Sequence, residues 1–181
     1  MPEPKKSKPV TPGKMAIFRA ADAPTLEEAG MMAAPTFTEE GANDDPSIAD
    51  SAERSMDGSV LTVPFQQEGA GGFSLVSIDF APGFLLPRHS HSSDCLYYIV
   101  AGEIVMGKRT LGPGDGFFLP AEQPYAYHAG PSGVKLLEFR HETAFDMKIS
   151  EKNMVAYHAK AEALRAQAND HGASKLTTPS E

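Results

Sequence analysis

The chain has 181 residues, a formal net charge of −8 and 41% hydrophobic residues. This length suits one domain with extensions, and the acidic balance argues against a nucleic-acid-binding protein, which needs a concentrated basic face. No segment approaches the roughly 20 apolar residues that cross a membrane as a helix, and the single cysteine, Cys95, cannot form an internal disulfide.

The first two segments are polar. Residues 1–14 are rich in Lys and Pro and lack the apolar stretch of a secretory signal, which predicts a disordered tail on a cytoplasmic protein. Residues 15–58 form a predicted N-terminal arm or long loop, with one helical turn near Thr25–Met32. Its acidic part, from Glu39 to Asp57, is typical of a solvated surface.

The chain changes character at Ser59, where short segments rich in β-branched and aromatic residues begin to alternate with Gly and Pro turns. Many short strands without intervening helices predict a sandwich or a barrel, which we place at residues 59–145. The fold class is therefore all-β.

Residues 146–181 are predicted to form a C-terminal helix and tail. Ser150 is the expected N-cap and Gly172 the expected stop. An apolar stripe at helical spacing has to pack on the barrel or on a partner subunit; it consists of Met154, Tyr157, Ala161, Leu164 and Ala168.

The most informative residues are His89 and His91, which are two positions apart. On a strand this spacing directs both imidazoles to the same face, and the interior of a barrel would receive both. Neutral imidazole is a common ligand of transition metals. The pair therefore predicts a metal site, and a metal-free pocket that holds a ligand by hydrogen bonds is the alternative.

This region resembles the first conserved motif of the cupin superfamily, which is Gly, five residues, His-x-His, three or four residues, Glu, six residues, Gly. Here the motif reads Gly83, His89, His91, Cys95 and Gly102, so Cys replaces Glu. The resemblance implies a double-stranded β-helix (jelly-roll) barrel, here with an N-terminal arm and a C-terminal helix.

A weaker second motif follows. It runs from Gly114 to Pro120, and then has Glu122 where the family has Gly and Tyr125 where it has His. The resemblance covers about half of the chain.

The resemblance implies a ligand set for the metal. His89 and His91 keep two of the four usual positions, and Cys95 and Tyr125 occupy the other two, where either could ligate as an anion. The expected cofactor is a divalent ion, Fe, Zn, Mn or Ni. A His/His site completed by waters and a third ligand from His128 remain alternatives. Some thiol dioxygenases of the superfamily also carry Cys at the Glu position.

Three further residues are candidates for catalysis. Tyr125 and Tyr127 share a strand face, so both can reach the pocket. Glu138 would be a general base if it faced the cavity, although an exposed ion pair with Arg140 is the plainer interpretation. Tyr97 is most simply a packing residue of the barrel.

The resemblance favours a metal-dependent enzyme acting on a small organic molecule, with oxygen-dependent cleavage as the first choice because the ligand set is oxidisable. A non-catalytic module that binds or senses a small ligand is the alternative. The resemblance also implies a homodimer, in which exchange of segment 15–58 between subunits would cover a sheet edge.

Overall fold

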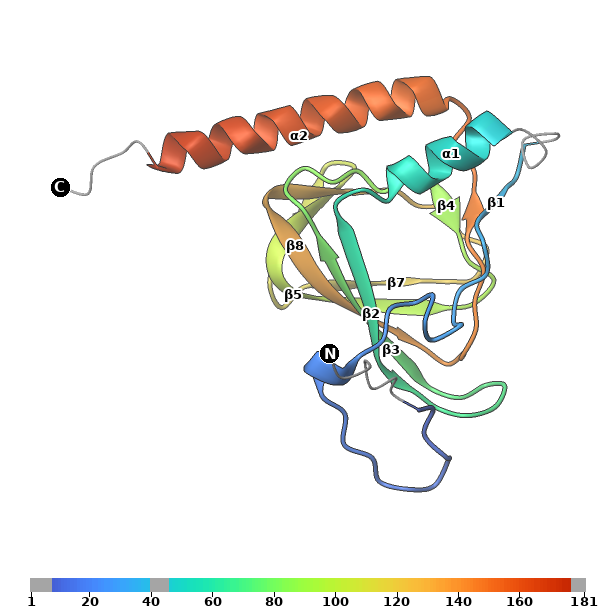
Figure 1. Cartoon of the computed structure of the whole chain (residues 1–181). Coiled ribbons are helices and arrows are strands. Elements are labelled where there is room, and N and C mark those ends of the chain that lie inside the picture. Colours follow the sequence, from blue (N-terminus) through green and yellow to red (C-terminus); the bar gives the residue numbers. More distant parts are fainter. Residues whose placement is uncertain (1–7, 40–45, 177–181) are drawn as a thin grey trace, which may run out of the picture.

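The computed structural model describes residues 8–39 and 46–176. Strands dominate, and two longer helices flank them (Figure 1). In chain order the elements are the 3-10 helix η1 (Ala20–Asp22), β1 (Thr36–Phe37), α1 (Pro46–Ser55), β2 (Ser59–Gln66), β3 (Ser74–Phe80), β4 (His89–Ser90), β5 (Cys95–Met106), β6 (Arg109–Leu111), β7 (Gly116–Leu119), β8 (His128–Arg140), β9 (Lys148–Ile149) and α2 (Met154–Leu176).

Two sheets form a barrel. The larger sheet has the order β2-β3-β8-β5-β6, with β7 also paired to β5, and the smaller has the order β1-β9-β4. Bridges from His89 to Tyr125 and from Leu85 to His128 add pairing beyond these strands. The prediction of an all-β jelly-roll barrel with a C-terminal helix is confirmed by this arrangement.

Alternation of side chains explains the strands. On β5 the side chains of Cys95, Tyr97 and Ile99 are buried, whereas Leu96 and Tyr98 between them are about half exposed. This period of two is expected for a strand with one face toward a core. The inward face joins the main hydrophobic cluster of the barrel.

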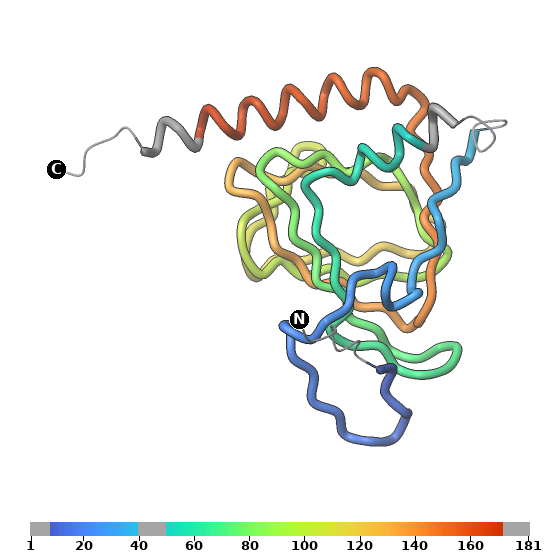
Figure 2. Tube along the Cα trace, viewed as in Figure 1, coloured from blue at the N-terminus to red at the C-terminus, as the bar shows by residue number. Residues whose placement is uncertain are grey.

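The arm packs on the barrel of its own chain. In Figure 2 it runs, in blue, along one side of the barrel toward the end where the two helices lie. Val10 pairs with Gln67, β1 pairs with β9, and Leu26 and Met31 are buried in the core. Residues 1–14 were predicted to be a disordered tail. Residues 1–7 of this tail lie outside the described residues, and Val10 forms a β-bridge. The homodimer remains a prediction.

The acidic stretch and the C-terminal segment correct two expectations. Helix α1 lies within the stretch that was predicted to be a loop. Helix α2 begins after Asn153, whose side-chain oxygen accepts a hydrogen bond from the Ala156 N–H (2.9 Å), and it continues through Gly172. Ser150 instead donates its backbone N–H to the carbonyl of Arg88, so it does not cap the helix.

The apolar stripe of α2 packs on the barrel. Tyr157 and Ala161 contact Leu85, and the Tyr157 hydroxyl donates to the Leu85 carbonyl (2.6 Å). Gly83 has φ +68°, and a Cβ there would collide with the backbone of Leu164 in α2. This glycine of the first motif thus allows the close approach of helix and barrel. No described helix is both long and apolar enough to cross a membrane.

Candidate functional site

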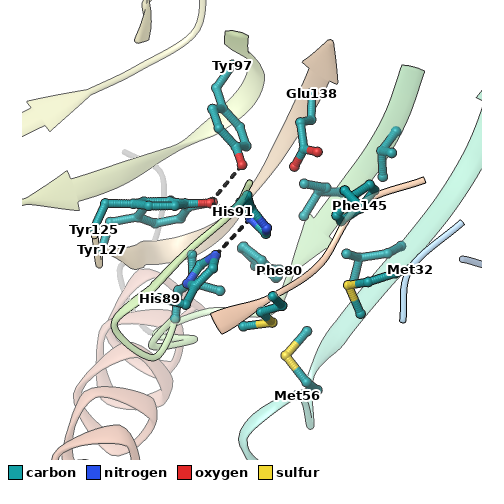
Figure 3. A pocket seen from close by; sticks show the side chains of 15 residues that line it. Met32, Met56, Phe80, His89, His91, Tyr97, Tyr125, Tyr127, Glu138 and Phe145 are labelled. Carbon is teal, nitrogen blue, oxygen red and sulfur yellow. Dashed lines mark hydrogen bonds between the residues drawn. The ribbon is translucent and has the colours of Figure 1, made fainter. Parts of the chain in front are cut away.

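A small cavity of about 40 Å³ lies inside the barrel. Polar side chains gather on one side of it, and Met32 and Met56 lie on the other (Figure 3). The space holds a few water molecules at most. Its lining consists of Met32, Met56, Leu61, Val76, Ile78, Phe80, Leu86, His89, His91, Tyr97, Tyr125, Tyr127, Glu138, Phe145 and Met147.

Both predicted histidines face this cavity. His89 lies on β4 and pairs with Tyr125 through both backbone groups, and His91 follows directly after the strand. The exposed fraction is 2% for His89 and 7% for His91. Their Nε2 atoms are 3.1 Å apart, as the same-face spacing predicted.

The remaining ring nitrogens fix the tautomers. Nδ1 of His89 lies 2.8 Å from the Pro87 carbonyl, and Nδ1 of His91 lies 2.5 Å from the Asp146 carbonyl. A carbonyl oxygen can only accept, so each Nδ1 carries the proton. In neutral imidazoles both Nε2 atoms then present lone pairs to each other.

With both rings neutral, no hydrogen lies between the two Nε2 atoms, and they form a hydrogen bond only if one ring is protonated. Burial, followed by the neighbouring His91, lowers the pKa of His89 to about 3. Burial and then Arg140 lower the pKa of His91 as well. The pair is thus neutral near pH 7, and a cation between the lone pairs would relieve their repulsion.

The spacing of the two nitrogens suits a metal ion. Nitrogens about 2.0–2.1 Å from one ion are separated by about 3.0 Å at a right angle and about 3.4 Å in a tetrahedral arrangement. The observed 3.1 Å lies between these values. Backbone carbonyls that hold the distal Nδ1–H are the usual outer support of metal-binding histidines.

Three tyrosines complete the polar side. The hydroxyls of Tyr97 and Tyr125 are hydrogen-bonded at 2.7 Å, and the Tyr125 hydroxyl is 3.4 Å from His91 Nε2. Burial raises the pKa of Tyr97 and Tyr125 well above the usual range, and also that of Tyr127. The Tyr127 backbone carbonyl accepts from the Leu86 N–H (2.9 Å), whereas its hydroxyl has no hydrogen-bond partner within the described part of the chain and is a free donor.

Glu138 and Arg140 form a buried ion pair, not the exposed pair that the sequence favoured. Glu138 is 4% exposed and Arg140 is 1% exposed, and Arg140 Nε donates to Glu138 Oε1. The guanidinium also donates from Nη1 to Ser93 Oγ (3.1 Å) and lies 3.9 Å from the centre of the Phe145 ring. Of the two ionic groups, Glu138 lines the cavity.

Cys95 and His128 are not placed with the histidine pair. The Cys95 Sγ donates to the Ser93 carbonyl (3.4 Å), and burial raises the pKa of the thiol to about 12. His128 starts β8 and lines a separate groove beneath α2. Over the described residues, no group of three or more His, Cys, Asp or Glu side chains is arranged to hold a metal ion. We therefore leave both residues out of the ligand set.

Sequence reasoning missed several residues of the cavity, among them Tyr97, Met32 and Met56. Tyr97 was assigned to packing, although its spacing of two from Cys95 on β5 would have placed it on the inward face. Met32 and Met56 come from segments before and after α1. No local pattern indicates where such segments meet the barrel.

The turn that carries the second motif supports His91 from outside. Glu122 has φ +64°, in the left-handed region where the family has Gly. Its N–H donates to the His91 carbonyl (2.8 Å), and its carboxylate pairs with Lys148 Nζ at 2.5 Å. Lys148 also lies 3.4 Å from Asp146, the residue whose carbonyl accepts from the His91 ring.

A scan of protein-family models found no match, and neither did a search of curated proteins. Solved structures do match. The polyketide cyclase RemF from Streptomyces resistomycificus is 22% identical with a TM-score of 0.41, over 46% of this chain and 65% of that one.

Two further structures are RmlC-like cupins. The protein from Ralstonia eutropha JMP134 is 11% identical with a TM-score of 0.48, over 71% of this chain and 69% of that one. The protein from Shewanella frigidimarina NCIMB 400 is 24% identical with a TM-score of 0.41, over 48% of this chain and 78% of that one.

These likenesses concern the fold. The chain itself has the jelly-roll topology, with Gly83 and Gly102 at positive φ and both histidines of the first motif turned inward. In this topology and in this motif, the chain resembles the cupins.

Proposed function

We propose that the chain is a metal-dependent cupin enzyme that acts on a small organic molecule. The observation that carries this proposal is the pair of Nε2 lone pairs that face each other at 3.1 Å while both Nδ1 protons are donated to backbone carbonyls. Such a pair is arranged to accept a cation.

The residues present fit a divalent ion. His89 and His91 would hold it, and the Tyr125 hydroxyl is the next oxygen, 3.4 Å from His91 Nε2. With few protein ligands, the other coordination positions would belong to water or substrate. A bound ion would supply Lewis acidity toward a substrate oxygen.

The other polar residues would serve the substrate. The free hydroxyl of Tyr127 can donate a hydrogen bond to a substrate oxygen. Glu138 has one carboxylate oxygen on Arg140 and its second oxygen free to accept a proton or a hydroxyl hydrogen. The methionines and Phe145 exclude water, which strengthens each of these polar interactions.

Oxygen-dependent cleavage stays our first choice of reaction, although only one of the two oxidisable ligands that supported it remains. That choice depended on two oxidisable ligands, Cys95 and Tyr125, and the Cys95 thiol points to the Ser93 carbonyl instead. Oxygen uptake by the iron-loaded protein with a panel of enolisable ketones, catechols and thiols tests this choice.

A non-catalytic module that binds a small ligand is the second candidate. It is favoured by the small cavity and by the lack of a third His, Cys, Asp or Glu beside the pair within the described residues. Product analysis separates the two functions, since binding of a ligand that is recovered unchanged in the presence of metal and oxygen supports the second.

Elemental analysis tests the metal directly. We expect the purified protein to carry about one divalent ion per chain and His89→Ala and His91→Ala to lose it. His128→Ala is the matched control and should keep the ion, and circular dichroism should show that all three variants are folded. Metal retained in His91→Ala would overturn the ligand assignment.

A further inference from the structure

The cavity is almost free of formal charge. Among the described residues that line it, no Lys or Arg is present and Glu138 is the one carboxylate. Apart from the histidines, the tyrosines and Glu138, its walls are aliphatic, aromatic or thioether side chains, which include Met32 and Met56 (Figure 3).

The Arg140 guanidinium stands behind the Glu138 carboxylate and is mostly engaged. Arg140 is already paired with Glu138 and Ser93, and it is not one of the described lining residues. Its Nη2 has no partner in the described part of the chain, but this nitrogen is buried and the Glu138 carboxylate stands at the cavity wall. An anion in the cavity would therefore lie closer to the negative Glu138 carboxylate, which repels it, than to the Arg140 guanidinium.

We propose that the substrate has a single polar head and an uncharged apolar tail. The proposal rests on the proposed function, because it names the ligand class of that same site. The head, a hydroxyl or an enolisable carbonyl, lies among the histidine pair, Tyr127 and Glu138. The tail lies against Met32, Met56 and Phe145. Phosphates, dicarboxylates and amino acids are excluded, since their second charge would be buried without a partner.

The size of the cavity adds a second limit. At about 40 Å³ it has no room for a large molecule. Met32 and Met56 are only partly buried and unbranched, and methionine adapts readily to a neighbour. The tail is therefore small, about one ring, and enters by displacing these two side chains.

A matched pair of probes tests this class. 4-Methylcatechol and 3,4-dihydroxybenzoate share a head of two adjacent hydroxyls and differ by a methyl or a carboxylate at the tail. We expect 4-methylcatechol to shift the NMR signals of the Met32, Met56 and Met147 methyl groups in protein labelled at methionine and loaded with zinc. The exposed Met15 should not respond. Binding of 3,4-dihydroxybenzoate should be at least about thirty-fold weaker.

A variant with a new positive charge in the cavity should shift the preference toward the carboxylate probe. Met32→Lys places a cation at the tail and should strengthen binding of 3,4-dihydroxybenzoate by at least about ten-fold. Met15→Lys adds the same charge outside the cavity and should leave both affinities unchanged. Equal binding of the two probes, a preference for the carboxylate in the natural sequence, or no shift with either probe would overturn the proposal.

Metal analysis of the same samples separates this inference from the proposed function. If the protein binds no metal and 4-methylcatechol still shifts the three methionines in preference to the carboxylate, the metal assignment fails and the ligand class stands. If metal is bound but the preference for 4-methylcatechol is absent, the ligand class fails and the metal assignment stands.

Discussion

Two pairs of polar side chains in the barrel interior differ in one respect. Glu138 and Arg140 neutralise each other, and the guanidinium has further partners in Ser93 and Phe145. His89 and His91 are equally buried, but they face each other with the same kind of atom. The first pair is largely satisfied by the protein alone, and the second needs something added. This difference separates a pair that is satisfied within the fold from a pair that we propose binds an ion.

The largest expected effect concerns the ion pair. Arg140→Met leaves the Glu138 carboxylate buried without its partner and should lower the free energy of unfolding by about 3–5 kcal/mol. The double variant Glu138→Leu/Arg140→Met should recover most of this loss, to within about 1 kcal/mol of the natural sequence. Urea unfolding measures both. A double variant as unstable as the single one would show that the loss does not come from the unpaired Glu138 carboxylate.

The histidine pair should respond to metal, whereas the ion pair should not. Zinc at a hundred times its dissociation constant should stabilise the natural protein by about 2.7 kcal/mol. His89→Ala and His91→Ala should lose this increment, as measured by thermal unfolding with zinc and with a chelator. In the double variant at positions 138 and 140 the increment should persist, and its loss there would contradict the division between the pairs.

The turn at Glu122 tests how rigidly His91 is held. Glu122→Gly removes both the ion pair to Lys148 and the strain of φ +64°, whereas Glu122→Ala removes only the ion pair. The Gly variant should therefore be more stable than the Ala variant by about 1 kcal/mol. Both keep the N–H that donates to the His91 carbonyl, so both should keep their metal. Equal stability of the two would mean that the turn is not strained.

The smallest effect is expected at Cys95. Because burial raises its pKa to about 12, the thiol stays protonated at pH 8 and should not react with a thiol reagent until urea unfolds the protein. Cys95→Ser should leave the metal content unchanged. Metal loss in this variant, with the fold intact by circular dichroism, would return Cys95 to the ligand set.

The sequence predicted what depends on local spacing. The many short strands predicted the barrel, and two histidines two residues apart predicted the shared cavity face. Spacing also indicated that Tyr125 and Tyr127 reach the same space. These predictions succeeded because the strand period of two converts sequence position directly into direction.

Contacts between distant segments could not be predicted in this way. Met32 reaches the cavity because the chain around it pairs with the segment at Phe145, more than 100 residues later. Burial of the ion pair between Glu138 and Arg140 likewise depends on Ser93 and Phe145. Helix α1 was missed because an acidic composition is compatible with either a loop or a helix surface.

Phe145 and Asp146 connect the N-terminal arm with the histidine pair. Phe145 exchanges backbone hydrogen bonds with Met31 and Ala33 of the arm, and the next carbonyl orients the His91 ring. The backbone on either side of Met32 is therefore bonded one residue away from the carbonyl that holds the His91 ring. If a ligand enters by displacing Met32, as we propose, filling of the cavity would be coupled to the orientation of that imidazole.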